Sequence, residues 1–270
     1  MFSHLGLENY AIGIPFIALV VIAFVWGQKI FKKFIHKEKI ESCHEVGGII
    51  LGIIGTIYAV TLGLVVLDAM TKFETTESLM LNEAQSLMLV ASIAEQFKTE
   101  GKGEVIRQLS KDYIDEVVTI DWELLGKGIR GHQKAGLILK RLFNEVKKIE
   151  PLTENEKGLF PVLLQEVTSI VKYRSSRIDA SLFGIPTMKW IMLIGGGVIT
   201  IIFTYFFTIG NEKIQSMMTG MITLMIAMNL YMVLMFTQPY IGDFQASKRS
   251  LLVAQRLIQE DMSELVKNKK

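Results

Sequence analysis

The stretch HEVGGIILGIIGTIYAVTLGLVVLD, residues 44–68, decides the fold of this chain. From Val46 to Leu67 it contains no Asp, Glu, Lys or Arg. An uncharged apolar run of about 20 residues has the length that crosses a bilayer. Because lipid offers no hydrogen-bond partner to the backbone, such a run must be helical. Residues 46–68 therefore predict a transmembrane helix.

Three further stretches have the same character: residues 10–27, 188–210 and 217–238. The first is not a secretory signal, since it lacks a preceding basic segment and a cleavage site of small residues. These uncharged runs exclude a soluble single domain, a disordered chain and a nucleic-acid binder, and the net charge of only +2 gives no general attraction to polyanions. We expect a multi-pass protein of the cell membrane, surrounded by lipid.

The four spans predict an all-α integral membrane protein with a helical insert between the second and third spans. Apolar residues in the insert recur at helical spacing, and Thr153 with Glu156 forms a capping box that opens its last helix. The tail is an amphipathic helix that packs on the insert, on a neighbouring subunit or along the membrane surface. The expected parts are transmembrane helices one and two in 1–68, a helical extramembrane domain in 69–186, transmembrane helices three and four in 187–240, and the C-terminal tail in 241–270.

The charges leave open which side of the membrane holds the insert. Five lysines lie in the loop between the first two spans, which favours this loop in the cytoplasm and the insert outside. Basic residues also flank the spans on the opposite side, namely Lys172, Arg174, Arg177, Lys248 and Arg249. The orientation therefore stays undecided, with a slight lean to the insert outside.

Small residues form a stripe along the second span. Steps of three and four place them on one face of the helix, and Thr56 adds a hydroxyl beside them. The stripe consists of Gly48, Gly52, Gly55, Ala59 and Gly63. Close packing of two helices is the commoner role of such a stripe. The alternative is the wall of a water-filled pore, where missing side chains leave a path and expose carbonyl groups.

Uncharged polar groups mark the third and fourth spans. Thr200, Thr204 and Thr208 form a ladder of hydroxyls, which either bond the carbonyl of the preceding turn or line a permeation path. Asn229 in the fourth span is expected to face protein or water rather than lipid. No ionisable side chain lies in the middle of any span, where proton-coupled transporters usually have one.

The sequence gives no support to an enzyme. One cysteine and four scattered histidines form neither a disulfide framework nor a metal cluster. Nucleotide-binding and hydrolase motifs are absent from the sequence. We expect no catalytic residue, no cofactor and no metal.

Motifs at the edges of both helix pairs form a set. They are residues 44–48, 55–60 and 62–63, then Phe73, Glu77 and Glu83, then Arg177, Pro186 and Trp190, and finally residues 239–242. As a set they resemble the bestrophin-like family of bacterial four-span membrane proteins of unknown function. Family members typically have an Asp-Arg pair before the last proline, where this chain has Thr237 and Gln238. Any role of that charge pair therefore does not carry over.

The resemblance implies a distant relative of the bestrophins, which are pentameric anion channels. The first hypothesis is a homo-oligomeric channel for inorganic ions, a pentamer for anions by resemblance. Its pore would lie on the oligomer axis, because four spans enclose no obvious internal pore. The second hypothesis is a non-conducting assembly or signalling protein whose insert binds a partner. A third, a stator-like energy-coupling subunit, shares only the layout of the spans.

Overall fold

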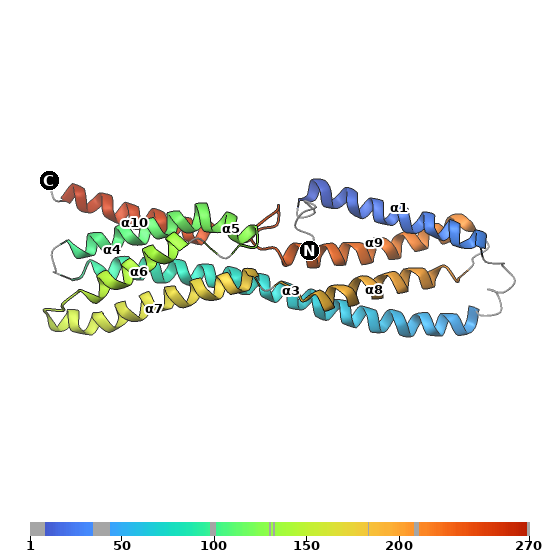
Figure 1. The fold of residues 1–270 in the computed structure, drawn as a ribbon, viewed down its shortest axis with the longest axis horizontal. Coiled ribbons are helices and arrows are strands. Elements are labelled where there is room, and N and C mark those ends of the chain that lie inside the picture. Colours follow the sequence, from blue (N-terminus) through green and yellow to red (C-terminus); the bar gives the residue numbers. More distant parts are fainter. Residues whose placement is uncertain are drawn as a thin grey trace. The chain divides into compact units, whose positions relative to one another are not determined.

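The structure is a computed structural model that describes residues 9–34, 44–97, 101–129, 131, 133–182, 184–207 and 211–268. Every regular element within those ranges is a helix, which confirms the predicted all-α fold (Figure 1). The elements are α1 Tyr10–Phe34, α3 His44–Ala94, α4 Lys102–Glu116, the π-helical turn η1 Val117–Asp121, α5 Trp122–Gly126, α6 Gln133–Lys147, α7 Glu154–Leu182, α8 Thr187–Thr204, α9 Glu212–Phe236 and α10 Arg249–Asn268.

Four of these helices are long and apolar enough to cross a membrane: α1, α3, α8 and α9. With 51 residues, α3 is roughly 75 Å long at the rise of an α-helix, more than twice the hydrocarbon thickness of about 30 Å. The second span and the first helix of the insert are therefore one helix. α8 ends at Thr204, six residues before the predicted end of the third span. Asn211 caps α9 by accepting hydrogen bonds from two backbone amides of its first turn.

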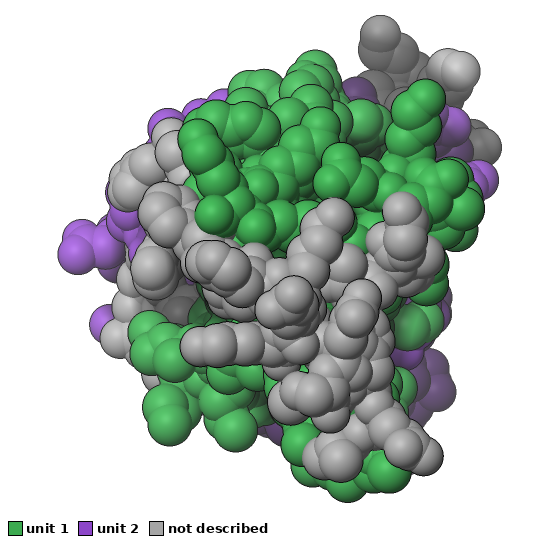
Figure 2. Space-filling view, turned by 90° about the vertical axis from the view of Figure 1, so that its right-hand side faces the viewer, with its two compact units in different colours: residues 1–72, 184–238, 242–244 green, residues 73–183, 239–241, 245–270 purple. Residues whose placement is uncertain are grey.

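The chain divides into two compact units (Figure 2). The membrane unit consists of residues 1–72, 184–238 and 242–244, and the helical unit of residues 73–183, 239–241 and 245–270. α3 supplies its first part to the membrane unit and its second part to the helical unit.

The membrane unit is built around α9, which packs against both α1 and α8 (Figure 1). Its core is a cluster of buried apolar side chains from α3, α8 and α9, including Tyr58, Leu62, Val65, Leu193, Ile201, Ile226 and Val233. At the start of α8, the Lys189 ammonium lies 2.9 Å from the carboxylate of Asp68 at the end of the uncharged run. This ion pair lies next to the apolar part of the unit and joins α8 to α3.

The helical unit has its own apolar core, formed by α4, α6, α7, α10 and the second part of α3. One bond of the predicted capping box is present, since the Glu156 amide donates to Thr153 Oγ1 at 3.2 Å; the Glu156 carboxylate accepts at 2.7 Å from the amide of Leu152, one residue before the cap. The apolar stripe of the tail enters this core through Leu251 and Ile258, which expose almost no surface. Among the three partners that the sequence allowed for the tail, the structure has the insert.

Candidate functional site

The stripe of small residues on α3 packs against nothing within the described part of the chain. A Cβ atom added at Gly48, Gly52, Gly55 or Gly63 would meet no other atom within 4 Å. Ala59 is exposed as well. We call this face, with Thr56, the small-residue side of α3. Close packing, the commoner role of such a stripe, is therefore not its role within the part of the protomer that the structure describes.

α3 instead packs on α8 through a different side. Tyr58, Leu62 and Val65 are buried in the core of the membrane unit and, at 3.6 residues per turn, lie roughly a quarter of a turn from the small-residue side. A third side carries large apolar side chains that are all exposed. We call it the large apolar side, and its residues are Ile49, Ile53, Ile57, Val60, Leu64 and Leu67. Both exposed sides of α3 are thus available to a neighbouring subunit, to lipid or to water.

The close helix packing that glycine permits occurs in α8. A Cβ atom at Gly196 would lie 2.6 Å from the Tyr58 ring, and one at Gly197 would lie 2.9 Å from the Tyr58 hydroxyl oxygen and 3.1 Å from Ile226. Contacts this short are not compatible with a side chain, so these two glycines hold α8 against α3. The four glycines of the small-residue side make no such contact with the described residues.

The hydroxyl groups predicted as candidates bond within their own helices. Thr56 donates to the Gly52 carbonyl at 2.8 Å, Thr200 to the Gly196 carbonyl at 2.8 Å and Thr204 to the Ile201 carbonyl at 2.6 Å. This is the usual bond of a threonine in a membrane helix. Thr208, the third member of the predicted ladder, lies outside the described residues.

Asn229 makes the same kind of local bond. Its side-chain amide donates to the Met225 carbonyl at 2.8 Å, one turn earlier in α9, and the residue is half-buried. Its nitrogen is therefore satisfied inside the helix, while the side chain keeps part of its surface exposed.

A buried polar cluster links α1, α8 and α9, and the sequence did not predict it. The Gln28 side-chain amide donates to Thr219 Oγ1 at 3.0 Å, and the hydroxyl oxygens of Thr204 and Thr219 are 3.5 Å apart. The sequence predicts that the first span ends at Gly27 and that Gln28 begins a loop. In the structure α1 continues to Phe34, so Gln28 lies on a helix of the membrane unit. The spacing of Thr219 and Thr223 was visible in the sequence, but their partners on other helices were not.

The helical unit contains a fully buried ion pair. Arg177 of α7 and Glu83 of α3 expose no side-chain surface, and they are joined by bonds of 2.7 Å from Nε and 3.2 Å from Nη2. The Tyr113 hydroxyl of α4 also donates to the Glu83 carboxylate. One carboxylate thus ties together three helices of this unit.

The surroundings of the pair change the pKa of its neighbours. Burial raises the pKa of the Tyr113 phenol well above its usual value, and the Glu83 charge acts in the same direction. Burial opposes the charge of Arg177, but the Glu83 carboxylate outweighs it, so the pKa of Arg177 lies well above its usual value. Burial also raises the pKa of Tyr240 to about 12. At neutral pH both phenols are neutral and the guanidinium is charged.

A second buried ion pair lies nearby in the same unit. Asp121, at the end of the π-helical turn, exposes no side-chain surface and accepts a bond of 3.1 Å from Arg174 of α7. Gly131 packs closely beside it, since an added Cβ atom would lie 3.1 Å from the Asp121 carboxylate. Within the described ranges, no three His, Cys, Asp or Glu side chains are grouped so that they could hold a metal ion.

The family model of the Bestrophin-like domain matches residues 16–251. The chain belongs to the Bestrophin-like family. Solved structures agree with this fold. Two variants of a bacterial bestrophin homologue from Klebsiella pneumoniae are each 11% identical and cover 90% of this chain, with TM-scores of 0.66 and 0.64 over 98% and 95% of their own lengths. A further crystal structure, of a membrane protein, is 12% identical to this chain and has a TM-score of 0.66. The match covers 90% of this chain and 97% of the other.

No curated protein matches the sequence. Identities of 11–12% to the solved structures show the fold and leave the activity to be argued from the residues. The resemblance seen in the sequence is confirmed, and this Bestrophin-like chain is a membrane protein.

Two of the residues in the resembling motifs, Glu83 and Arg177, meet in the buried ion pair of this Bestrophin-like chain. The sequence contained a signal for this. Glu83 falls in the apolar register of α3 between Met80 and Leu87, and Arg177 falls seven residues after the buried Ile170. A charged residue on a buried stripe requires a buried partner of opposite charge. Nothing in the spacing indicated which residue the partner would be.

Proposed function

We propose that this Bestrophin-like protein is the subunit of a homo-oligomeric ion channel whose pore lies on the oligomer axis. The small-residue side of α3 is our first candidate for the pore lining. The observation that carries this proposal is the open space beside four glycines of α3, where an added Cβ atom would meet nothing within 4 Å. A side of a membrane helix that is free of bulk and of charge leaves room for water beside exposed carbonyl groups.

The interior of the protomer offers less room for a pore. The space between α3, α8 and α9 is filled by the apolar core, in which Leu193 and Val233 expose no surface. A path around a symmetry axis, with one copy of α3 from each subunit, needs no such internal space. A pentamer and a preference for anions are the starting assumptions, and both rest on the resemblance to bestrophins.

The uncharged spans favour passive permeation. No Asp, Glu, Lys, Arg or His lies in the middle of a span, so the chain has no group there that would carry a proton through the bilayer. A stator-like role would therefore need a second subunit that brings a carboxylate.

The test uses the purified protein in liposomes, with chloride and potassium fluxes measured separately. We expect a protein-dependent chloride flux that Gly55→Phe reduces at least tenfold, because a ring on the small-residue side would fill the path. The matched control is Ile53→Phe on the large apolar side, which should leave the flux within twofold. Absence of flux for either ion, or equal loss in both variants, would count against the proposed lining.

The same open side of α3 also supports a second candidate, a non-conducting assembly protein in which the small-residue side packs against a neighbouring subunit. The two candidates differ in the effect of Gly52→Leu on the oligomer. Tight packing predicts that the added side chain dissociates the oligomer, as measured by its mass in detergent. A pore predicts an intact oligomer with reduced flux.

A further inference from the structure

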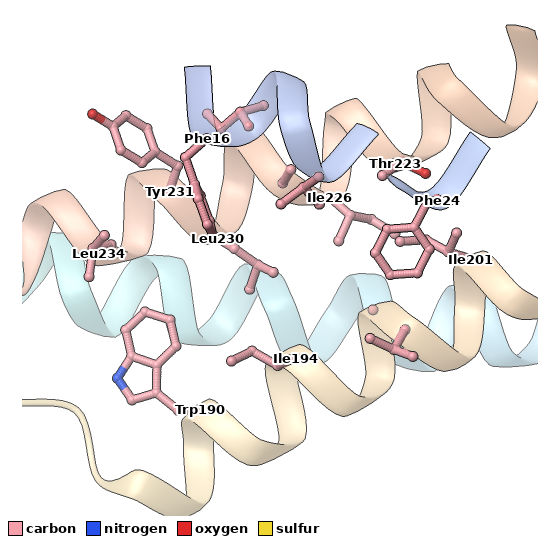
Figure 3. Close-up of a pocket in the computed structure, with 15 residues that line it drawn as sticks. Phe16, Phe24, Trp190, Ile194, Ile201, Thr223, Ile226, Leu230, Tyr231 and Leu234 are labelled. Atoms are coloured by element: carbon pink, nitrogen blue, oxygen red, sulfur yellow. The ribbon is translucent and has the colours of Figure 1, made fainter. Parts of the chain in front are cut away.

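The membrane unit contains an apolar groove between α1 and α8, with α9 as its floor (Figure 3). Its volume is about 280 Å³. The walls are side chains such as Phe16 and Phe24 of α1, Trp190 and Ile194 of α8, and Ile226 and Leu230 of α9. All of them come from helices that are long and apolar enough to span the membrane.

At one end of the groove, α1 contacts the end of α8. There the Tyr205 hydroxyl, directly after α8, donates to the Phe24 carbonyl at 2.6 Å, and the rings of Tyr205 and Phe31 lie 5.6 Å apart. Towards Phe16 and Trp190 the space between the two helices belongs to the groove. From Trp190 to Ile201 the wall is roughly 16 Å long at the helical rise, which is close to half of the hydrocarbon thickness of about 30 Å. The groove is therefore as long as one leaflet of a bilayer.

The chemistry of the walls excludes water as the occupant. The Thr223 hydroxyl lies at the end of the groove near Phe24 and Ile201 (Figure 3), and it already donates to the Thr219 carbonyl at 2.8 Å. A buried water needs two to four polar partners, whereas an engineered apolar cavity of about 150 Å³ stays dry and binds benzene. The groove is nearly twice that size. If it were empty, its lining would lose contacts on one side, which destabilises a protein in proportion to the empty volume.

We propose that one acyl chain of a bilayer phospholipid occupies this groove and holds α1 against α8. The mouth opens to the surface, since Phe16 is 43% and Ile194 is 38% exposed. A chain can therefore enter sideways from one leaflet. At the end of the groove opposite Thr223, Trp190 supplies an amphipathic ring of the kind that favours the membrane–water interface. Its neighbour Lys189 shares the Asp68 carboxylate with Lys72, at 2.9 and 3.6 Å, so these three residues carry one net positive charge on the side where the lipid phosphate would lie.

The first experiment uses phospholipids brominated on the acyl chain, which quench tryptophan fluorescence on contact. Trp190 lines the groove, whereas Trp26 is 66% exposed on the outer surface of α1. A Trp26→Phe variant reports Trp190, a Trp190→Phe variant reports Trp26, and both keep the same background from Trp122. If a lipid chain stays in the groove, the dependence of Trp190 quenching on the fraction of brominated lipid should differ from that of Trp26 quenching. After rapid mixing with brominated lipid, Trp190 quenching should also develop at least tenfold more slowly than Trp26 quenching. Identical curves and rates for the two tryptophans would overturn the proposal.

A groove-filling variant provides the second test. Ala227→Phe places a ring in the floor of the groove, and Ala18→Phe places the same ring on the exposed surface of α1. In bilayers that contain a phospholipid with a photoreactive acyl chain, we expect labelling of α8 between Trp190 and Ile201 that falls at least fivefold in Ala227→Phe and not in Ala18→Phe. If Ala227→Phe does not fold, competition by unlabelled lipids on the unaltered chain decides.

The source of the chain is tested in the same assay. Excess unlabelled phospholipid should suppress the labelling, and free fatty acid at equal concentration should not. If only free fatty acid suppressed the labelling, the occupant of the groove would be a fatty acid rather than a phospholipid, and the proposal would be overturned. Labelling that spreads evenly over the exposed helix faces would do the same, as would a cross-link from the groove to a second copy of the chain.

Discussion

Replacing Glu83 by alanine should destabilise the helical unit strongly, because it leaves the Arg177 guanidinium buried without a counter-charge. Neither side chain exposes any surface, and two hydrogen bonds of 2.7 and 3.2 Å join them. Removing one partner of a buried pair costs about 3–5 kcal/mol. The Tyr113 hydroxyl loses its acceptor in the same step. We expect a loss near the upper end of that range.

Removing both charges should be far less harmful. When a buried pair is replaced by apolar side chains of similar volume, the change is often neutral or stabilising by about 1–4 kcal/mol. The double variant Glu83→Leu with Arg177→Met is therefore expected to be more stable than Glu83→Ala by at least about 3 kcal/mol. For a unit of about 140 residues, 1 kcal/mol shifts Tm by roughly 3–5 °C, so the single variant, which loses about 4–5 kcal/mol, should lose about 12–25 °C.

The assay is thermal unfolding of the purified protein in detergent, in a background with Trp26→Phe and Trp190→Phe, so that the fluorescence reports Trp122, which is buried in the helical unit. Glu83→Gln keeps the shape of the side chain and removes its charge, so it separates the loss of charge from the loss of packing. A Tm loss below about 3 °C for Glu83→Ala would refute the reasoning. So would a double variant whose loss equals the sum of the two single variants.

Three further results are expected. Gly197→Ala should cost about 1–3 kcal/mol, since its Cβ atom would strike the Tyr58 hydroxyl, whereas Gly52→Ala, whose Cβ atom meets nothing, should be neutral or stabilise by up to about 1 kcal/mol through helix propensity; equal Tm changes would contradict this. Burial raises the pKa of Tyr240 to about 12, whereas the pKa of an unfolded tyrosine is about 10. The contribution of Tyr240 to the free energy of unfolding is therefore complete below pH 10 and falls by about 1.4 kcal/mol per pH unit up to pH 12. In denaturant titrations, the free energy of unfolding of Tyr240→Phe should fall less steeply over this pH range. Thr153→Ala should cost about 1 kcal/mol in the same titrations through the lost cap of α7, and a cost near zero would show that the cap is dispensable.

The sequence predicted the number and type of the spans because an uncharged run has few alternatives in a bilayer. Hydropathy does not limit where a helix ends outside lipid, so α1 continues past Lys29 to Phe34 although the span was predicted to end at Gly27. The opposite occurs at α8. Its apolar run continues past Thr204, yet the α-helix ends there. The backbone amides of residues 205–207 donate instead to carbonyls three residues earlier, so the chain continues as a tighter turn whose amides stay hydrogen-bonded.

The candidate site was predicted in part. Periodicity placed the small residues of α3 on one face, but only three-dimensional packing shows that Tyr58 contacts Gly196 and Gly197 of α8, while the four glycines of the small-residue side meet no described residue. Pairs such as Gln28 with Thr219, or Glu83 with Arg177, join residues far apart in the chain. A single sequence contains the polarity of each member of such a pair and no record of its partner.

The most direct test of the proposed channel is a cysteine scan of α3 in a Cys43→Ser background, with reconstituted current recorded during treatment with a charged thiol reagent. A pore lined by the small-residue side predicts that cysteine substitutions at Gly52, Gly55 and Gly63 react and block the current. Substitutions at Ile57 and Leu64 on the large apolar side should leave it unchanged. Block from the large apolar side alone, or a purified oligomer that passes no current, would contradict the proposed lining or the proposed function.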